Sequence, residues 1–248
     1  MTENAWLRRF TKLTAVSTLF LIFAGGMVTS TGSGLSVPDW PLSYGSLFPP
    51  MVGGVFYEHG HRMVATLVGF FTLSLAIWLW LKEERQWVKT IGYCALGAVI
   101  LQGVLGGVTV LFFLPTPVSV AHGVLAQTFF LMTIFLAYAQ SQERFARAGT
   151  AILADRPLQN WSLLLVVSIY IQLILGAIMR HTGSGLAVYD FPTMAGEWLP
   201  HVNALFLERI NAWRFDQGLD SVAMPNVFFH LAHRFWAGLV LVLLLFVN

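Results

Sequence analysis

The sequence predicts an all-α integral membrane protein built from two repeated four-helix-bundle halves, the second of them truncated. Composition is the first observation, because the 248-residue chain is 56% hydrophobic and 10% charged, whereas soluble domains carry roughly 25% charged residues. Six apolar stretches are the second, since each is long enough to cross hydrocarbon, which takes roughly 20 helical residues. The third is a motif that occurs twice, which indicates an internal repeat.

The six stretches are expected to be helices, because every backbone polar group in hydrocarbon must find its partner within its own segment. They cover residues 13–29, 60–81, 91–114, 118–139, 161–179 and 227 to the C-terminus. The first stretch runs into a glycine-rich motif and not into a small-residue cleavage site, so we expect a retained span. Cys94, the sole cysteine, is expected to be a small packing residue within the third stretch.

Basic residues set the expected orientation. Nine of the fourteen Lys and Arg residues lie before the first span, between the second and third, or between the fourth and fifth, so we expect this side and the N-terminus to be cytoplasmic. The opposite loops, 30–57 and 115–117, contain no Lys or Arg. Five arginines belong to the outer half and are expected to have specific roles there: Arg62, Arg180, Arg209, Arg214 and Arg234.

The repeat is clearest in residues 25–41 and 176–192, which share nine identities in seventeen positions, including an unbroken TGSGL. Further on, residues 58–68 align with residues 230–240, which superposes one His-Arg pair on another. The offset between the copies grows from 151 to 172 residues, so the second outer loop carries an extra 21 residues.

Both copies begin on the outer side, which predicts parallel halves related by a pseudo-twofold axis along the membrane normal. The expected halves are residues 1–150, with four helices, and residues 151–248, with two helices and a long outer loop. Six of eight helices would then be present. The counterpart of His122 is expected near position 294, which lies 61 residues beyond His233.

Histidines near the outer ends of spans are the main candidates for chemistry. His61 opens the second span and His122 opens the fourth, so two such helices, packed side by side, could turn both imidazoles inward and hold a heme. An interhelical hydrogen bond explains a lone membrane histidine equally well. The matching His233 favours iron ligation, and the lack of cysteine clusters and of a second nearby carboxylate disfavours zinc or a di-iron site.

Glu58 lies three residues before His61, so both would share one helix face if the helix extends back by one turn. An acid would then stand beside a cofactor. The alternative is a carboxylate that the helix dipole favours at a helix start. The repeat has His230 in the place of Glu58, which suggests that one half reacts and the other serves it.

Arg62 and Arg234 directly follow the ligand candidates. Guanidinium groups bind carboxylates bidentately, so we expect these arginines, together with His230, to contact heme propionates or to line the pocket. A structural salt bridge or an interfacial side chain is the alternative. Asp39 and Asp190 are candidate partners for the arginines, or turn residues.

Five stretches together run the length of the chain: GGMVTSTGSGLSVPDWPLSYG, EHGHR, AHGVLAQ, GAIMRHTGSGLA and HLAHR. In this combination the sequence resembles the heme A synthase family of cytochrome oxidase assembly. The resemblance implies oxidation of the C8 methyl group of heme O to a formyl group through hydroxylated intermediates, with Glu58 as the acidic residue needed for activity. It also implies that His61 and His122 hold the substrate, heme O, and that His233 is one ligand of a heme b cofactor.

The resemblance further implies a multi-pass protein of the bacterial inner membrane, with its heme sites toward the outer face. Many bacterial members carry a cysteine pair in the first outer loop, where this chain has Val37 and Ser43. A mechanism that depends on those thiols therefore cannot apply here. The sequence also lacks the residue that would be the second axial ligand of the C-terminal heme, so that heme site is expected to be incomplete.

A bis-histidine membrane cytochrome b that transfers electrons is the alternative function. A heme or proton transporter would distribute polar residues through the membrane, whereas here they gather at one face. The net charge of +2 is too small for nucleic-acid binding. The expected partners are heme O, the lipid bilayer, heme O synthase and oxidase assembly factors, and small residues on the spans favour a homo-oligomer.

Overall fold

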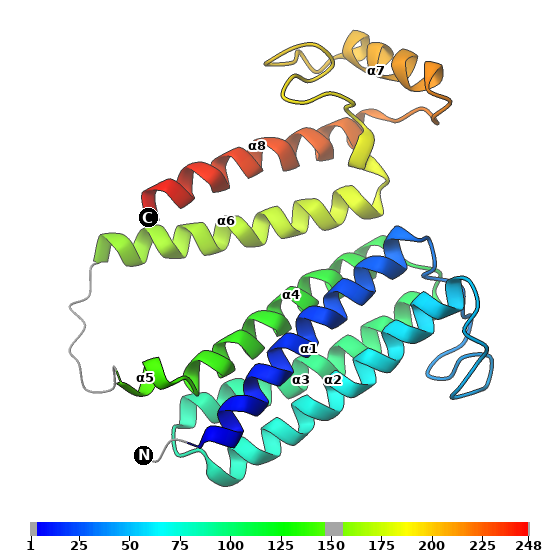
Figure 1. Cartoon of the computed structure of the whole chain (residues 1–248). Helices are drawn as coiled ribbons and strands as arrows, with labels where there is room; N and C mark the ends of the chain where they lie inside the picture. The colour runs from blue at the N-terminus through cyan, green and yellow to red at the C-terminus, as the bar shows by residue number, and fades with distance from the viewer. Residues whose placement is uncertain (1–3, 147–155, 248) are drawn as a thin grey trace. The chain divides into compact units, whose positions relative to one another are not determined.

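The computed structural model confirms the predicted all-α membrane fold and describes residues 4–146 and 156–247 (Figure 1). Six of its helices are long and apolar enough to span a membrane: α1 (Ala5–Ser30), α2 (Gly54–Lys82), α3 (Gln86–Leu111), α4 (Thr116–Ala139), α6 (Arg156–His181) and α8 (Met224–Val247). The shorter elements are α5 (Gln142–Ala146), the 3-10 helix η1 (Ser184–Leu186) and α7 (Ala204–Asp216). Within the described ranges, β-structure is limited to two isolated bridges.

The helices begin earlier than hydropathy alone predicts, because hydropathy detects only the part of a helix that lies in hydrocarbon. α1 starts at Ala5, where the side chain of Asn4 caps it by accepting hydrogen bonds from two main-chain N–H groups at 3.1 Å. α2 starts at Gly54 and not at residue 60. This earlier start places Glu58 and His61 on the first turns of one helix, as the predicted acid–histidine face requires.

Residues 1–151 form one compact unit, in which α1, α2, α3 and α4 make a bundle. α1 packs against α2 and α4, and α3 packs against the same two helices. α2 and α4 therefore face each other across the bundle, with α1 and α3 on either side. Leu75, Leu79, Phe129 and Leu136 fill its core, while many large apolar side chains on all four helices point outward, as expected of helices in lipid.

Residues 152–248 form the second compact unit. Its described part pairs α6 with α8, and η1 packs against both. A second core joins α7, the rest of the segment between α6 and α8, and the start of α8. It includes Val188, Phe206, Ile210 and Val227. α7 lies in this loop, which sequence analysis expected to be longer than its counterpart. The helix was not predicted, because it is too short and too polar to be a span.

Candidate functional site

The loop between α1 and α2 (residues 31–53, the first loop) and the loop between α6 and α8 (residues 182–223, the second loop) share one construction. The carboxylate of Asp39 accepts hydrogen bonds from main-chain N–H groups five and six positions further on, at 2.7 and 2.8 Å. The carboxylate of Asp190 accepts the equivalent pair at 2.5 and 2.8 Å. The N–H of Gly45 in particular holds the pKa of Asp39 below its usual value. Both aspartates are therefore turn residues, and their carboxylates do not bind the nearby arginines.

Arg62 holds the first loop through its main chain. Its Nη1 donates to the carbonyl oxygens of Asp39 and Leu42 at 2.7 and 2.8 Å, and its Nη2 donates to that of Val37 at 3.4 Å. Arg234 holds the second loop in the same way, through three carbonyl oxygens at 2.6 to 3.3 Å. The structure therefore gives both arginines a loop-anchoring role, and contact with a heme propionate stays a prediction.

Glu58 is almost entirely buried at the start of α2, with 3% of its surface exposed. Its Oε1 accepts from Arg62 Nη2 at 2.6 Å, and its Oε2 accepts from the main-chain N–H of Val37 at 2.8 Å. In the second unit the same place is held by His230, which is also buried and whose Nδ1 lies 2.9 Å from the carbonyl oxygen of Ser184. One unit thus has a buried charge pair where the other has an arginine and an imidazole.

His61 and His122 come from α2 and α4, so they approach each other across the bundle and not from helices packed side by side, as the sequence had suggested. They are close enough for the charges of the two imidazoles to interact. A glycine, which has no side chain, lies against each ring. A Cβ on Gly25 of α1 would lie 3.0 Å from Cε1 of His61, and one on Gly106 of α3 would lie 3.5 Å from Cε1 of His122.

His233, on α8, has a similar neighbour on α6. A Cβ on Gly176 would lie 3.0 Å from Cε1 of the His233 ring. The side-chain nitrogen of Gln172, one turn earlier on α6, lies 3.1 and 3.2 Å from the two ring nitrogens and donates to the main-chain carbonyl of His233 at 3.2 Å. Gln102 of α3 makes a comparable bond to the main-chain carbonyl of His122 at 3.0 Å.

These residues suit a heme. Imidazole nitrogens are axial ligands of heme iron, and the first unit brings two imidazoles, from α2 and α4, near each other. Oε1 of Gln102, whose amide nitrogen bonds the main chain of His122, is buried without a hydrogen bond, and buried polar atoms of this kind usually have a partner in the occupied protein. The glycines beside the rings let both imidazoles lie close to the backbones of α1 and α3.

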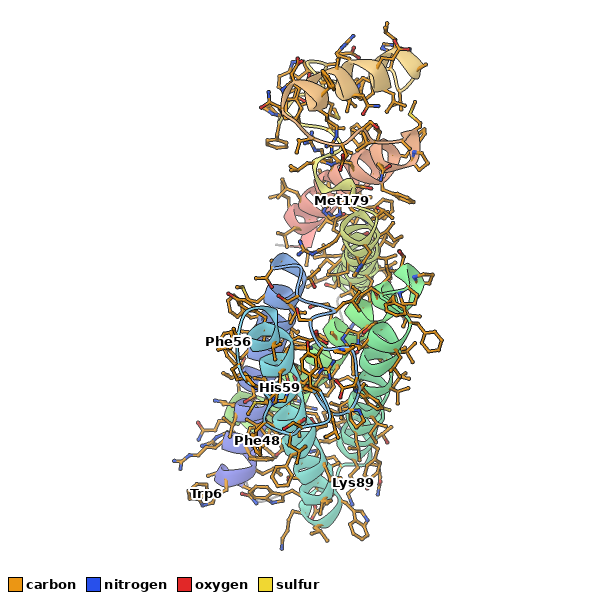
Figure 2. All side chains as sticks on the ribbon, turned by 90° about the vertical axis from the view of Figure 1, so that its right-hand side faces the viewer. Trp6, Phe48, Phe56, His59, Lys89 and Met179 are labelled. Carbon is orange, nitrogen blue, oxygen red and sulfur yellow. The ribbon has the colours of Figure 1, made fainter. Side chains whose placement is uncertain are left out.

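The first loop also reaches the bundle through Trp40. A Cβ on Gly107 of α3 would lie 2.7 Å from Cδ2 of the indole, so the ring packs directly on the backbone beside Gly106. His59, labelled on α2 in Figure 2, is bound from the same loop, since its Nδ1 lies 2.8 Å from Oγ of Ser43. The first loop therefore contacts both α2 and α3.

Sequence reasoning missed Gly25 and Gly176 as neighbours of the histidines. A signal was available, because both are the first identity of the seventeen-residue repeat. Gln102 and Gln172 were also missed, and neither lies in the repeated motif. The contact of Trp40 with α3 joins distant parts of the chain, which no local pattern indicates.

Comparison with known proteins gives a consistent result. Residues 8–54 and 52–248 match the family described as "Cytochrome oxidase assembly protein". A protein named "Heme A synthase" from Bacillus licheniformis is 31% identical over 205 residues, which cover 79% of this chain and 67% of the relative. "Heme A synthase" from Halalkalibacterium halodurans is 30% identical over 217 residues, which cover 82% of this chain and 70% of the relative. The chain thus spans about two thirds of the length of these relatives.

Proposed function

The chain belongs to the heme A synthase family of cytochrome oxidase assembly proteins, and from this premise we propose that it converts heme O to heme A. The C8 methyl group of heme O is oxidised to a formyl group through hydroxylated intermediates. With water as the oxygen donor, this change releases four electrons and four protons. The family favours this function over that of an electron-transferring cytochrome b.

Heme O is held in the first unit, between His61 of α2 and His122 of α4. The observation that supports this most directly is that a buried carboxylate, Glu58, lies three residues before His61 on the first turns of α2, while His122 approaches from across the bundle. In this arrangement the imidazoles bind the iron of the substrate. Glu58 then provides a negative charge at the same end of the bundle.

Glu58 is the proposed catalytic residue. Removal of two electrons and one proton from the methyl group leaves a positively charged carbon, which a nearby carboxylate can stabilise while it helps water to attack. Arg62 and the N–H of Val37 each hold one oxygen of this carboxylate, which fixes its direction. Arg62 is thus a positioning residue, and it keeps the buried charge of Glu58 compensated.

The second unit serves the first. A heme b cofactor, with His233 as one ligand, would supply redox chemistry there. Arg234 orders the second loop beside this site, and His230 takes the place of Glu58, so that the proposed catalytic carboxylate has no counterpart at this position. The orientation that we propose has the N-terminus in the cytoplasm and both sites toward the outer face, with heme O synthase and oxidase assembly factors as partners and a homo-oligomer as the assembly.

The test is to purify the full chain from cells that make heme O, extract its hemes and separate them by chromatography. The wild type should carry heme O together with a hydroxylated intermediate or heme A. Glu58→Gln should still bind heme O but form neither product. Glu197→Gln is the matched control, because Glu197 also pairs with an arginine, Arg209 at 2.8 Å, but on the exposed second loop.

Heme A formation by Glu58→Gln at the wild-type level would refute the catalytic role of Glu58. A wild type that binds only heme b in cells rich in heme O would refute the synthase function and leave the cytochrome b alternative.

A further inference from the structure

The ring of His61 lies directly against the backbone of α1 at Gly25. A Cβ at this position would lie 3.0, 3.4 and 3.7 Å from Cε1, Nδ1 and Nε2 of the ring. The first of these separations is closer than normal packing of two carbons, which is about 3.5 to 4.0 Å. The hydrogen on Gly25 is therefore the largest substituent that fits without moving the imidazole.

The second unit has the same contact. A Cβ on Gly176 would lie 3.0, 3.5 and 4.0 Å from the same three atoms of His233, in the same order. The two glycines are 151 residues apart and the two histidines 172, so the contact is present in both units although the loop between glycine and histidine differs in length. A contact that occurs twice in this way is not an accident of one loop.

The next residue, Gly26, shows that the need for glycine is confined to position 25. A Cβ on Gly26 would meet nothing within 4 Å, and the second copy of the motif has Ala177 there. A methyl group is therefore accepted one residue beyond the contact. Glycine destabilises a helix relative to alanine, so its presence at both positions that face a histidine needs a reason other than helix formation.

We propose that Gly25 is a positioning residue for His61. The missing side chain lets the imidazole lie directly against α1, with Cε1 nearest, and this contact limits how far the ring can turn and thus where its iron-binding nitrogen faces. The proposal rests on the function proposed above, in which His61 binds the iron of a heme. It predicts that a single methyl group on α1 disturbs iron ligation, although Gly25 itself does not touch the iron.

The contacts around the site predict a graded series of variants. Gly25→Ala should disturb the site most, because its Cβ would lie 3.0 Å from the ring of His61. Gly106→Ala should have a small effect, because its Cβ would lie at an ordinary 3.5 Å from the ring of His122. Gly26→Ala should have none. His61→Ala defines the complete loss of the ligand.

The experiment uses the full chain purified with its bound heme and measures the rate of heme transfer to excess apomyoglobin and the spin state of the iron by electron paramagnetic resonance. Gly25→Ala should lose heme at least tenfold faster than the wild type, the scale seen when the support of a metal ligand is removed, and low-spin iron should decrease. Gly26→Ala should match the wild type in both measurements, and Gly106→Ala should stay within about twofold.

Thermal unfolding of the same variants separates positioning from a folding defect. If Gly25→Ala lowers the melting temperature, the double variant Gly25→Ala/His61→Ala should have the same melting temperature as His61→Ala, because the ring that the methyl group displaces is gone. A double variant that melts lower than His61→Ala overturns the proposal, because the methyl group would then disturb helix packing and not the ring.

The two proposals fail in different ways. Retention of all heme by His61→Ala would overturn the ligand role of His61 and this inference with it. Loss of heme by His61→Ala, together with Gly25→Ala and Gly26→Ala that behave alike, would overturn this inference and leave the proposed function intact.

Discussion

Arg62 and Glu58 lie one turn apart on α2 and form an ion pair of 2.6 Å, with 14% and 5% of their side chains exposed. Arg234 occupies the corresponding place on α8 and makes the same kind of bonds to its loop, but His230 stands at the position that Glu58 holds in the first unit. Both units thus have an arginine that holds the loop, but only the first unit has a carboxylate at the position of Glu58. The anchor needs the arginine, whereas the acid is particular to the first unit.

Arg62→Lys should destabilise the protein more than Arg234→Lys. An ammonium group cannot reach the carboxylate and three carbonyl oxygens together, and only the first substitution disturbs a buried charge pair. We expect a loss of about 3 kcal/mol for Arg62→Lys and about 1 kcal/mol for Arg234→Lys, measured by denaturant unfolding in detergent. Arg209→Lys, in a pair with 45% and 32% of the side chains exposed, is the control, with less than about 1 kcal/mol. Equal losses at Arg62 and Arg234 would contradict this account.

Asp39→Ala should loosen the tip of the first loop alone. The substitution removes the acceptor for the N–H groups of Tyr44 and Gly45, so both amides should exchange hydrogen for deuterium several-fold faster. Exchange in the second loop, which Asp190 holds, should stay at the wild-type rate. Asp216→Ala, at the exposed end of α7, serves as the control. Unchanged exchange at Tyr44 and Gly45 would show that other contacts hold this turn.

Glu83, which directly follows α2, should make the stability of the bundle depend on pH. Burial opposes its ionisation, but hydrogen bonds from Arg85 and Gln140 outweigh burial and lower the pKa of Glu83 from 4.5 to about 2. A carboxyl whose pKa is lower in the folded state stabilises the fold above its unfolded pKa, and this contribution is lost as the pH falls. Unfolding measured between pH 5 and pH 2 should therefore show a steeper loss of stability, in roughly that range, for the wild type than for Glu83→Gln. Glu84→Gln, at the exposed neighbouring position, should behave like the wild type.

Gly107→Ala should displace Trp40 from α3, because the new Cβ would lie 2.7 Å from the indole. Overpacking of this kind costs about 1 to 3 kcal/mol. In the double variant Trp40→Ala/Gly107→Ala the loss should be smaller than the sum of the two single losses. Gly103→Ala, one turn earlier on α3 with open space at its Cβ, is the control for helix effects. Additive losses would mean that the indole and Gly107 do not interact energetically.

The sequence predicted the six spans well, because a helix must be apolar along the whole length that crosses the hydrocarbon. It also predicted that His61 and His122 lie near the starts of their helices, where the structure has them. It placed their helices side by side, however, because hydropathy carries no information on which helix neighbours which. The bonds of Arg62 to carbonyl oxygens were equally hidden, since main-chain acceptors leave no mark in the sequence. The pair of Glu58 with Arg62 was within reach, because a spacing of four residues joins opposite charges on a helix.

Within their loops, Arg62 and Arg234 bind mainly main-chain carbonyl oxygens, which every amino acid carries. An anchor of this kind does not depend on which side chains the loop displays, so the loop is free to change in evolution while its shape is kept. Val37 illustrates this freedom, whereas Ser43 also holds His59 through its hydroxyl group. Val37 bonds Arg62 and Glu58 through its carbonyl and N–H groups, which any residue other than proline would supply.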